Sequence, residues 1–195
     1  TPGESWRKLN DSEPEIISKS STHSELMHES YGIGIVSKIP VVSWHRLNLG
    51  NSPLGLPLIV PGDETGKGRP RFLYVKDEPR LALAAVLENG FTVVNTHLSF
   101  VPLVNLFQLL AITRWAKKIE KERSTKVALL GDFNLPWGLP TKVTRWKRVT
   151  DALTYPSWKP AISFDYILLR GDSQSKSKEV IAPAMTLSDH RPISI

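Results

Sequence analysis

The sequence predicts an α+β fold, built as a layered β-sandwich flanked by helices. Three observations support this prediction: strand patterns joined by hairpin turns, one long helical pattern between two strand patterns, and polar residues where strands end. The ends of strands are the positions that such a scaffold offers to active residues. Catalytic and binding residues are therefore expected there.

Length and composition limit the class of protein. A chain of 195 residues, with 41% hydrophobic and 23% charged residues, fits one globular domain over residues 1–195. The formal net charge of +6 favours anionic partners such as nucleic acid, phosphorylated substrates or acidic lipid head groups. Since there is no cysteine, disulfides, thiolate metal sites and a cysteine nucleophile are excluded. No apolar run is long enough for stable membrane insertion, and the sequence favours neither a cytoplasmic nor a secreted location.

The first seventy residues predict little regular structure. Residues 1–29 are polar and without clear periodicity, which is typical of loop. Two strands are predicted, over residues 34–37 and 41–49. Residues 51–70 are rich in proline and glycine and predict a long surface loop, because strand patterns resume directly after them.

The next part of the chain predicts a β-hairpin. Residues 71–75 and 81–88 have β-rich composition, and Asn89 with Gly90 is typical of a tight turn between two strands. The partner strand is expected over residues 91–96.

One long helix is predicted over residues 101–123, where apolar side chains recur with a period of 3.6 residues. The remaining elements follow in chain order: a buried strand over 126–130, a short amphipathic segment over 142–149, a strand over 163–169, a polar loop over 171–178 and a last strand after residue 190.

Polar residues follow two of these strands. Asp132 and Asn134 are two positions apart, which in an extended chain points both side chains to the same side. A carboxylate there can orient or deprotonate a water, while an amide donates to a phosphate oxygen; an ordinary turn explains the same residues equally well. His97 ends the strand over residues 91–96, where it either donates to a phosphate or a leaving oxygen or acts as a capping or surface histidine.

The last strands carry a second group of polar residues. Asp165 lies in an otherwise apolar strand and needs a partner, because a buried unpaired charge is costly. His190 is the natural partner, since a carboxylate fixes the tautomer of an imidazole; an ion pair with an arginine is the alternative. Asp189 is either a metal-binding carboxylate or a turn residue. Tyr31 either packs or reaches a phosphate with its phenol.

Taken in order, these segments resemble the endonuclease/exonuclease/phosphatase superfamily, in particular its deoxyribonuclease and sphingomyelinase branches. The resemblance covers residues 31–195, and its most specific motifs are Gly-Asp-Phe-Asn at residues 131–134 and Ser-Asp-His at residues 188–190. It implies a deoxyribonuclease-like four-layer fold and hydrolysis of phosphoester bonds with Mg²⁺ or Mn²⁺ as the cofactor.

The resemblance also implies a role for each matching residue. Asp132 would orient or activate the attacking water, and Asn134 would hold the phosphate. His190 would contact the scissile phosphate, braced by Asp165, and Asp189 would help to bind the metal.

Two features distinguish this chain within the superfamily. His97 matches the histidine of the deoxyribonuclease and sphingomyelinase branches, which apurinic endonucleases generally lack. The family also begins with an Asn strand and a Gln-Glu strand, and nothing upstream of Tyr31 matches them. We therefore expect a domain without its first strands and with an incompletely liganded metal. Nucleic acid is the first expected substrate; a lipid or inositol phosphate, and a non-catalytic binding domain on the same fold, are the alternatives.

Overall fold

The computed structural model describes residues 32–60, 69–171, 180–181 and 188–194. Tyr31, the predicted loop over residues 1–29 and most of the one over 171–178 lie outside these described residues. Apart from Gly32, the described residues belong to one compact unit, Ile33–Ile195. That residues 1–195 form a single domain stays a prediction.

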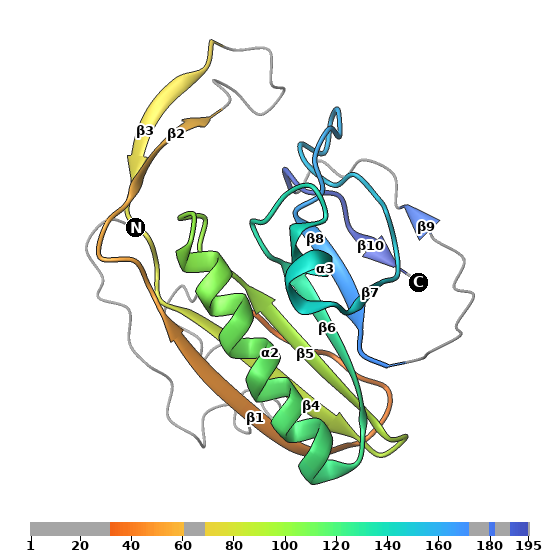
Figure 1. Cartoon of the computed structure of the whole chain (residues 1–195). Helices are drawn as coiled ribbons and strands as arrows, with labels where there is room; N and C mark the ends of the chain where they lie inside the picture. The colour runs from red at the N-terminus through yellow and green to blue at the C-terminus, as the bar shows by residue number, and fades with distance from the viewer. Residues whose placement is uncertain (1–31, 61–68, 172–179, 182–187, 195) are drawn as a thin grey trace, which may run out of the picture. The chain divides into compact units, whose positions relative to one another are not determined.

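Six strands form the main sheet. In spatial order they are β1 (Val41–Gly50), β4 (Arg80–Leu87), β5 (Phe91–His97), β6 (Lys126–Asp132), β8 (Asp165–Leu169) and β7 (Lys147–Arg148). Neighbouring strands are antiparallel except β5 and β6, which run parallel. A parallel pair needs a crossover connection, and the helix α2 (Val104–Arg123) supplies it (Figure 1). The predicted α+β fold is confirmed.

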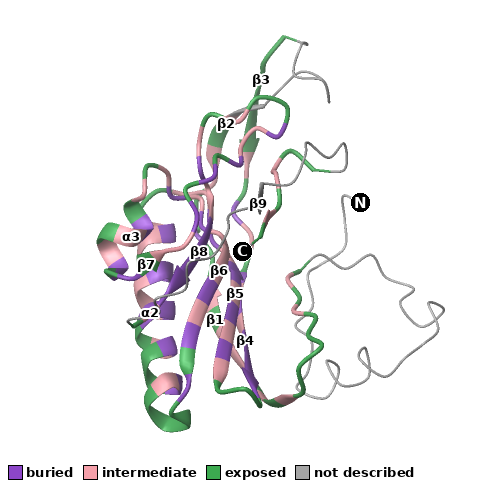
Figure 2. Ribbon diagram, turned by 90° about the vertical axis from the view of Figure 1, so that its right-hand side faces the viewer, coloured by how far each residue is buried: buried purple, intermediate pink, exposed green. Residues whose placement is uncertain are grey.

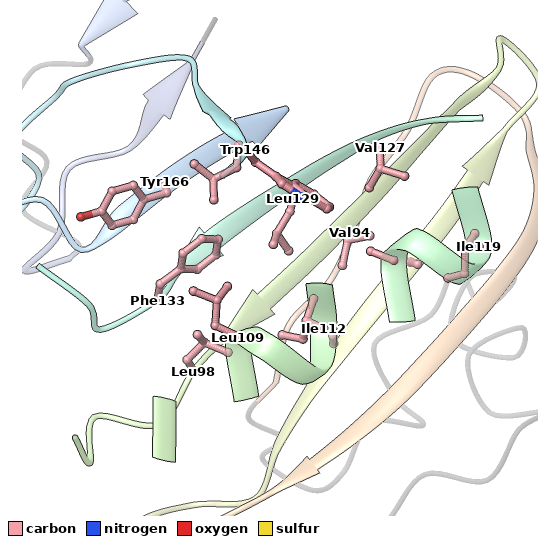
Figure 3. Close-up of a cluster of buried hydrophobic side chains, with 14 of the residues drawn as sticks. Val94, Leu98, Leu109, Ile112, Ile119, Val127, Leu129, Phe133, Trp146 and Tyr166 are labelled. Atoms are coloured by element: carbon pink, nitrogen blue, oxygen red, sulfur yellow. The ribbon is translucent and has the colours of Figure 1, made fainter. Parts of the chain in front are cut away.

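The hydrophobic core lies between α2 and one face of the main sheet. Leu109 and Ile112 of α2 pack in one cluster with Val94 of β5 and Leu129 of β6 (Figure 3). Figure 2 shows that the buried residues of α2 lie on the side that faces the strands. Every second residue of β5 is buried, so the intervening residues, which end with His97, point to the opposite face. The core therefore orients the polar end of β5 away from the helix.

Two further sheets have two strands each: β2 (Leu56–Val60) with β3 (Arg71–Val75), and β9 (Val180–Ile181) with β10 (Ile193–Ser194). The prediction of an uninterrupted loop over residues 51–70 is therefore wrong, because β2 lies within it and pairs with β3 along its whole length.

Other boundaries also differ from the prediction. Residues 34–37 form no strand, since alternating glycines weaken an extended segment. The predicted amphipathic segment over 142–149 is divided between the short helix α3 (Leu139–Thr144) and β7. Among the described residues, no helix combines the length and the apolar character that crossing a bilayer requires.

Candidate functional site

The parallel pairing of β5 and β6 brings two predicted site residues together. His97 and Asp132 are register partners at the ends of these strands. Nε2 of His97 lies 3.5 Å from Oδ2 of Asp132, and their side chains are 30% and 18% exposed. Both groups are therefore mostly buried and still accessible.

The antiparallel pairing of β6 and β8 adds a third residue, because Asp132 is the register partner of Asp165. Nδ1 of His190 lies 2.8 Å from Oδ2 of Asp165, as predicted for a carboxylate that braces an imidazole. Nε2 of the same ring lies 3.9 Å from Oδ2 of Asp132. His97, Asp132, Asp165 and His190 thus meet at one edge of the main sheet.

The terminal segment that carries His190 is held by contacts that the sequence did not suggest. Ser157 donates its backbone N–H to the carbonyl of Asp189 at 2.7 Å, and Arg191 donates to the carbonyl of Thr154 at 2.9 Å. The ring of Tyr155 lies 5.0 Å from that of His190, between centroids. No local signal indicates that residues 154–157 return to this segment, since the contacts join positions more than thirty residues apart.

Asp132 and Asn134 form a turn, which is one of the two alternatives that the sequence left open. Oδ1 of Asp132 accepts the backbone N–H of Asn134 at 2.9 Å, which is the pattern of an Asx turn. Asn134 has φ of 48°, in the left-handed region. Its Nδ2 donates to the carbonyl of Leu98 at 3.0 Å, which uses one of its two amide hydrogens. The turn therefore ties Asn134 to the ends of both β6 and β5.

Burial and neighbouring charges change the ionisation of the two residues at the centre. Burial, with the positive charges of Arg80 and His190, lowers the pKa of His97 to about 4. Burial and the charge of Asp165 raise the pKa of Asp132 to about 6. At neutral pH the 3.5 Å contact accordingly joins a neutral imidazole to a carboxylate, and it is not an ion pair.

The pKa of His190 shifts in the opposite direction from the pKa of His97. Burial alone would lower the pKa of His190, but the hydrogen bond that its ring donates to Asp165 and the charges of Asp165, Asp132 and Asp189 raise this pKa above its ordinary value. The site therefore combines one imidazole that favours the cation with one that stays neutral.

Three of these residues have the chemistry of a divalent-cation site. Ligand atoms of Asp132, Asp165 and His190 all lie within 4.8 Å of one another. Two carboxylates suit Mg²⁺ or Mn²⁺, which prefer oxygen ligands. Burial first, and then the negative charge of Asp165, raise the pKa of Asp132, and a cation would offset both effects, so these residues fit the ion. Asp189 is exposed and lies outside this group of three, and its metal-binding role stays a prediction.

Comparisons with known proteins match this chain to one family and to solved structures of similar fold. A family model described as the Endonuclease/Exonuclease/phosphatase family matches residues 9–190. A solved structure of a mannosyl-6-phosphatase from Bacteroides thetaiotaomicron VPI-5482 is similar in fold, with 12% identity and a TM-score of 0.53 over 80% of this chain and 65% of that one. An endonuclease/exonuclease/phosphatase family protein from Bacteroides thetaiotaomicron has 15% identity and a TM-score of 0.53 over 80% of this chain and 62% of that one.

The chain thus spans less than two thirds of the length of these two structures. Among curated proteins, none matches the chain in sequence. At such low identity the two structures establish the fold, and they do not carry a substrate over to this chain.

Proposed function

This chain belongs to the endonuclease/exonuclease/phosphatase family, and we propose that it is a metal-dependent hydrolase of phosphoester bonds. One observation carries this proposal: two imidazoles from different parts of the chain approach the same carboxylate oxygen. Nε2 of His97 and Nε2 of His190 lie 3.5 Å and 3.9 Å from Oδ2 of Asp132. An acid–base pair with a second donor beside it is what transfer of a phosphoryl group to water requires.

Asp132 is the group that accepts a proton from the attacking water. With a pKa of about 6, its carboxylate is ionised at neutral pH and yet more basic than an ordinary aspartate. Water attacks phosphorus as its proton moves to Asp132, and the bond from phosphorus to the leaving oxygen breaks, so that this oxygen departs with the bonding electron pair as an alkoxide stabilised by a neighbouring N–H donor.

The two histidines stabilise charge on the phosphate. His190, held in one orientation by Asp165, favours its cationic form and offers Nε2 to a phosphate oxygen. His97 stays neutral and offers a ring N–H to the phosphate or to the leaving oxygen. Asn134 holds the phosphate with the amide hydrogen that Leu98 does not accept.

The carboxylates of Asp132 and Asp165 would hold the divalent ion beside His190, and the ion would supply Lewis-acid stabilisation of charge on the phosphate oxygens. We assign nucleic acid as the first substrate class to test, because the net charge of +6 favours a polyanion. Lipid and inositol phosphates are the alternative substrate class, and in them too the bond from phosphorus to the leaving oxygen would break.

The proposal is tested by turnover of bis-(p-nitrophenyl) phosphate, p-nitrophenyl phosphate and single-stranded DNA by the full-length protein. We expect hydrolysis with Mg²⁺ or Mn²⁺ and its loss when EDTA is added. A folded protein that hydrolyses none of these, nor an inositol phosphate or a phospholipid, would make the site a binding site without catalysis.

A further inference from the structure

Trp137 combines an exposed ring with an unfavourable backbone conformation. Its φ of 55° lies in the left-handed region, where a bulky residue is an outlier, and the residue is 81% exposed. An indole usually contributes a large apolar area to a core or an interface. Since the fold tolerates backbone strain here without burying the ring, the position of Trp137 indicates a role toward a ligand.

A cleft of about 220 Å³ lies beside Trp137. Leu153 and Ile162 give it apolar walls, and the polar wall holds an ion pair, in which Nη1 of Arg148 lies 3.2 Å from Oδ1 of Asp151. Because this pair offsets the charge of the guanidinium, the cleft suits a neutral group better than a phosphate. A cavity of about 150 Å³ can hold benzene, so the cleft has room for a nucleobase.

Two walls of the cleft are close to site residues along the chain. Trp137 follows Asn134 by three residues, and a chain of that length spans at most about 11 Å. Ser163, which also lines the cleft, precedes Asp165 by two residues, and the corresponding limit is about 7 Å. Asp132 and Asp165 are register partners at one edge of the main sheet, so both walls connect to the sheet at that edge.

A third wall connects the cleft to the terminal segment. Leu153 is followed by Thr154, whose carbonyl accepts the backbone N–H of Arg191 at 2.9 Å. Arg191 comes directly after His190 in the chain. The three walls together place the cleft beside the position where His190 and Asn134 would hold a phosphate.

We propose that this cleft binds a nucleobase next to the scissile phosphate, with the indole of Trp137 stacked on the face of the base. The inference rests on the proposed function, which supplies the phosphate, and it selects nucleic acid as the substrate class. Aromatic side chains stack on every kind of base and so bind single strands without a strong sequence preference. The net charge of +6 favours the same polyanion, whereas an inositol phosphate offers no planar ring to the indole.

The test compares a short single-stranded DNA with an abasic oligonucleotide of the same length, both in metal-free buffer, by calorimetry. Trp137→Ala should weaken DNA binding by about tenfold or more, because stacking on one base is lost, and the loss should be confined to the ligand that carries bases. Trp137→Phe keeps an aromatic face and should weaken DNA binding by a smaller factor. Trp44→Ala is the matched control: Trp44 is 49% exposed on the edge strand β1, and this variant should bind DNA within twofold of the unaltered protein.

DNA affinity of Trp137→Ala within twofold of that of Trp44→Ala would overturn the inference. Equal losses for DNA and the abasic oligonucleotide would also overturn it, since Trp137 would then act on the backbone or on the fold. If Trp137→Ala does not fold, the unaltered protein decides, and equal affinity for the two oligonucleotides rules out a base-binding cleft.

Inorganic phosphate in Mg²⁺ buffer tests the phosphoester site separately, through the NMR signals of the His190 ring. If phosphate shifts these signals but DNA does not bind, only the inference about the cleft fails. If phosphate does not shift them, the proposed phosphoester site fails, and the inference fails with it.

Discussion

Nδ1 of His190 lies 2.8 Å from Oδ2 of Asp165, which joins the terminal segment to strand β8 across 25 residues. The other ring nitrogen faces Asp132, so the imidazole stands between two carboxylates. This position fixes which nitrogen faces the substrate and favours the cationic ring. The reactive end of His190 therefore depends on a residue that need not touch the phosphate.

Asp165→Asn should lower the pKa of His190, because it removes the negative charge and leaves only a neutral amide oxygen to accept the Nδ1 hydrogen bond. Turnover should fall by about 10²-fold, the scale of an impaired acid or donor group. NMR titration of the His190 ring measures the first effect and a diester assay the second. Asp151→Asn, at a carboxylate that is 91% exposed, is the control. An unchanged His190 titration in a folded Asp165→Asn variant would contradict the bracing role.

Stability should depend on the ionisation of Asp132. A carboxyl group whose pKa rises from 3.8 to about 6 on folding stabilises the fold below pH 3.8, and this contribution is lost as the pH rises through 6. Asp132→Asn should therefore raise the free energy of unfolding at pH 7 by on the order of 2 kcal/mol, and by much less at pH 4. Urea unfolding in metal-free buffer at the two pH values measures it.

His97 titrates over the same pH window with the opposite sign. Its pKa falls from 6.5 to about 4 on folding, so its contribution is present above pH 6.5 and is lost as the pH falls through 4. Both proteins in the Asp132 comparison carry His97, so the part of its contribution that does not depend on Asp132 cancels in the difference. Equal stability differences at pH 4 and pH 7 would show that Asp132 ionises in the fold as it does in water.

Manganese should bind at the carboxylates of Asp132 and Asp165, beside the ring of His190. Asp132→Asn removes one negative oxygen ligand and should weaken Mn²⁺ binding by about tenfold or more. Paramagnetic broadening of the His190 ring signals locates the ion, and calorimetry gives its affinity. Broadening that instead centres elsewhere, with Asp132→Asn unaffected, would remove this group from the metal site.

His97→Ala should reduce turnover by about 10²-fold with a smaller change in substrate affinity, because a donor used mainly in the transition state affects rate. His45→Ala is a matched control: His45 is a half-buried histidine on β1 whose Nε2 contacts Oγ of Ser43 at 3.0 Å. Turnover of a diester by both variants of the full-length protein distinguishes the site residue from a capping residue. Equal rates for the two variants would place His97 outside the reaction.

The sequence predicted the elements whose signals are local. The turn at Asn89 and Gly90 and the apolar period of α2 each depend on neighbouring residues, and both elements are found. The strand β2 was not predicted, because it lies in a proline-rich segment and is stabilised by pairing with β3, which lies outside that segment. Residues 34–37 have a strand-like composition but form no strand, because no strand among the described residues pairs with them.

Residue types predicted the site better than spacing did. An aspartate in the apolar strand β8 required a partner, and the structure supplies His190. By contrast, the spacing of Asp132 and Asn134 left an extended chain and a turn equally open, and the side-chain hydrogen bond that turns the chain between them decides for the turn. The burial of Arg80 could not be predicted either, because it depends on the pairing of β4 with β5.

We propose that the carboxylate of Asp132, which His97 and His190 approach, activates water for attack on a phosphoester. The most direct test is turnover of bis-(p-nitrophenyl) phosphate by Asp132→Asn in the full-length protein with Mg²⁺, against Asp151→Asn as control. We expect Asp132→Asn to lose about 10³-fold or more in rate while it remains folded and binds phosphate, and the control to match the unaltered protein. A folded Asp132→Asn protein with turnover within threefold of the control would show that Asp132 does not activate the water.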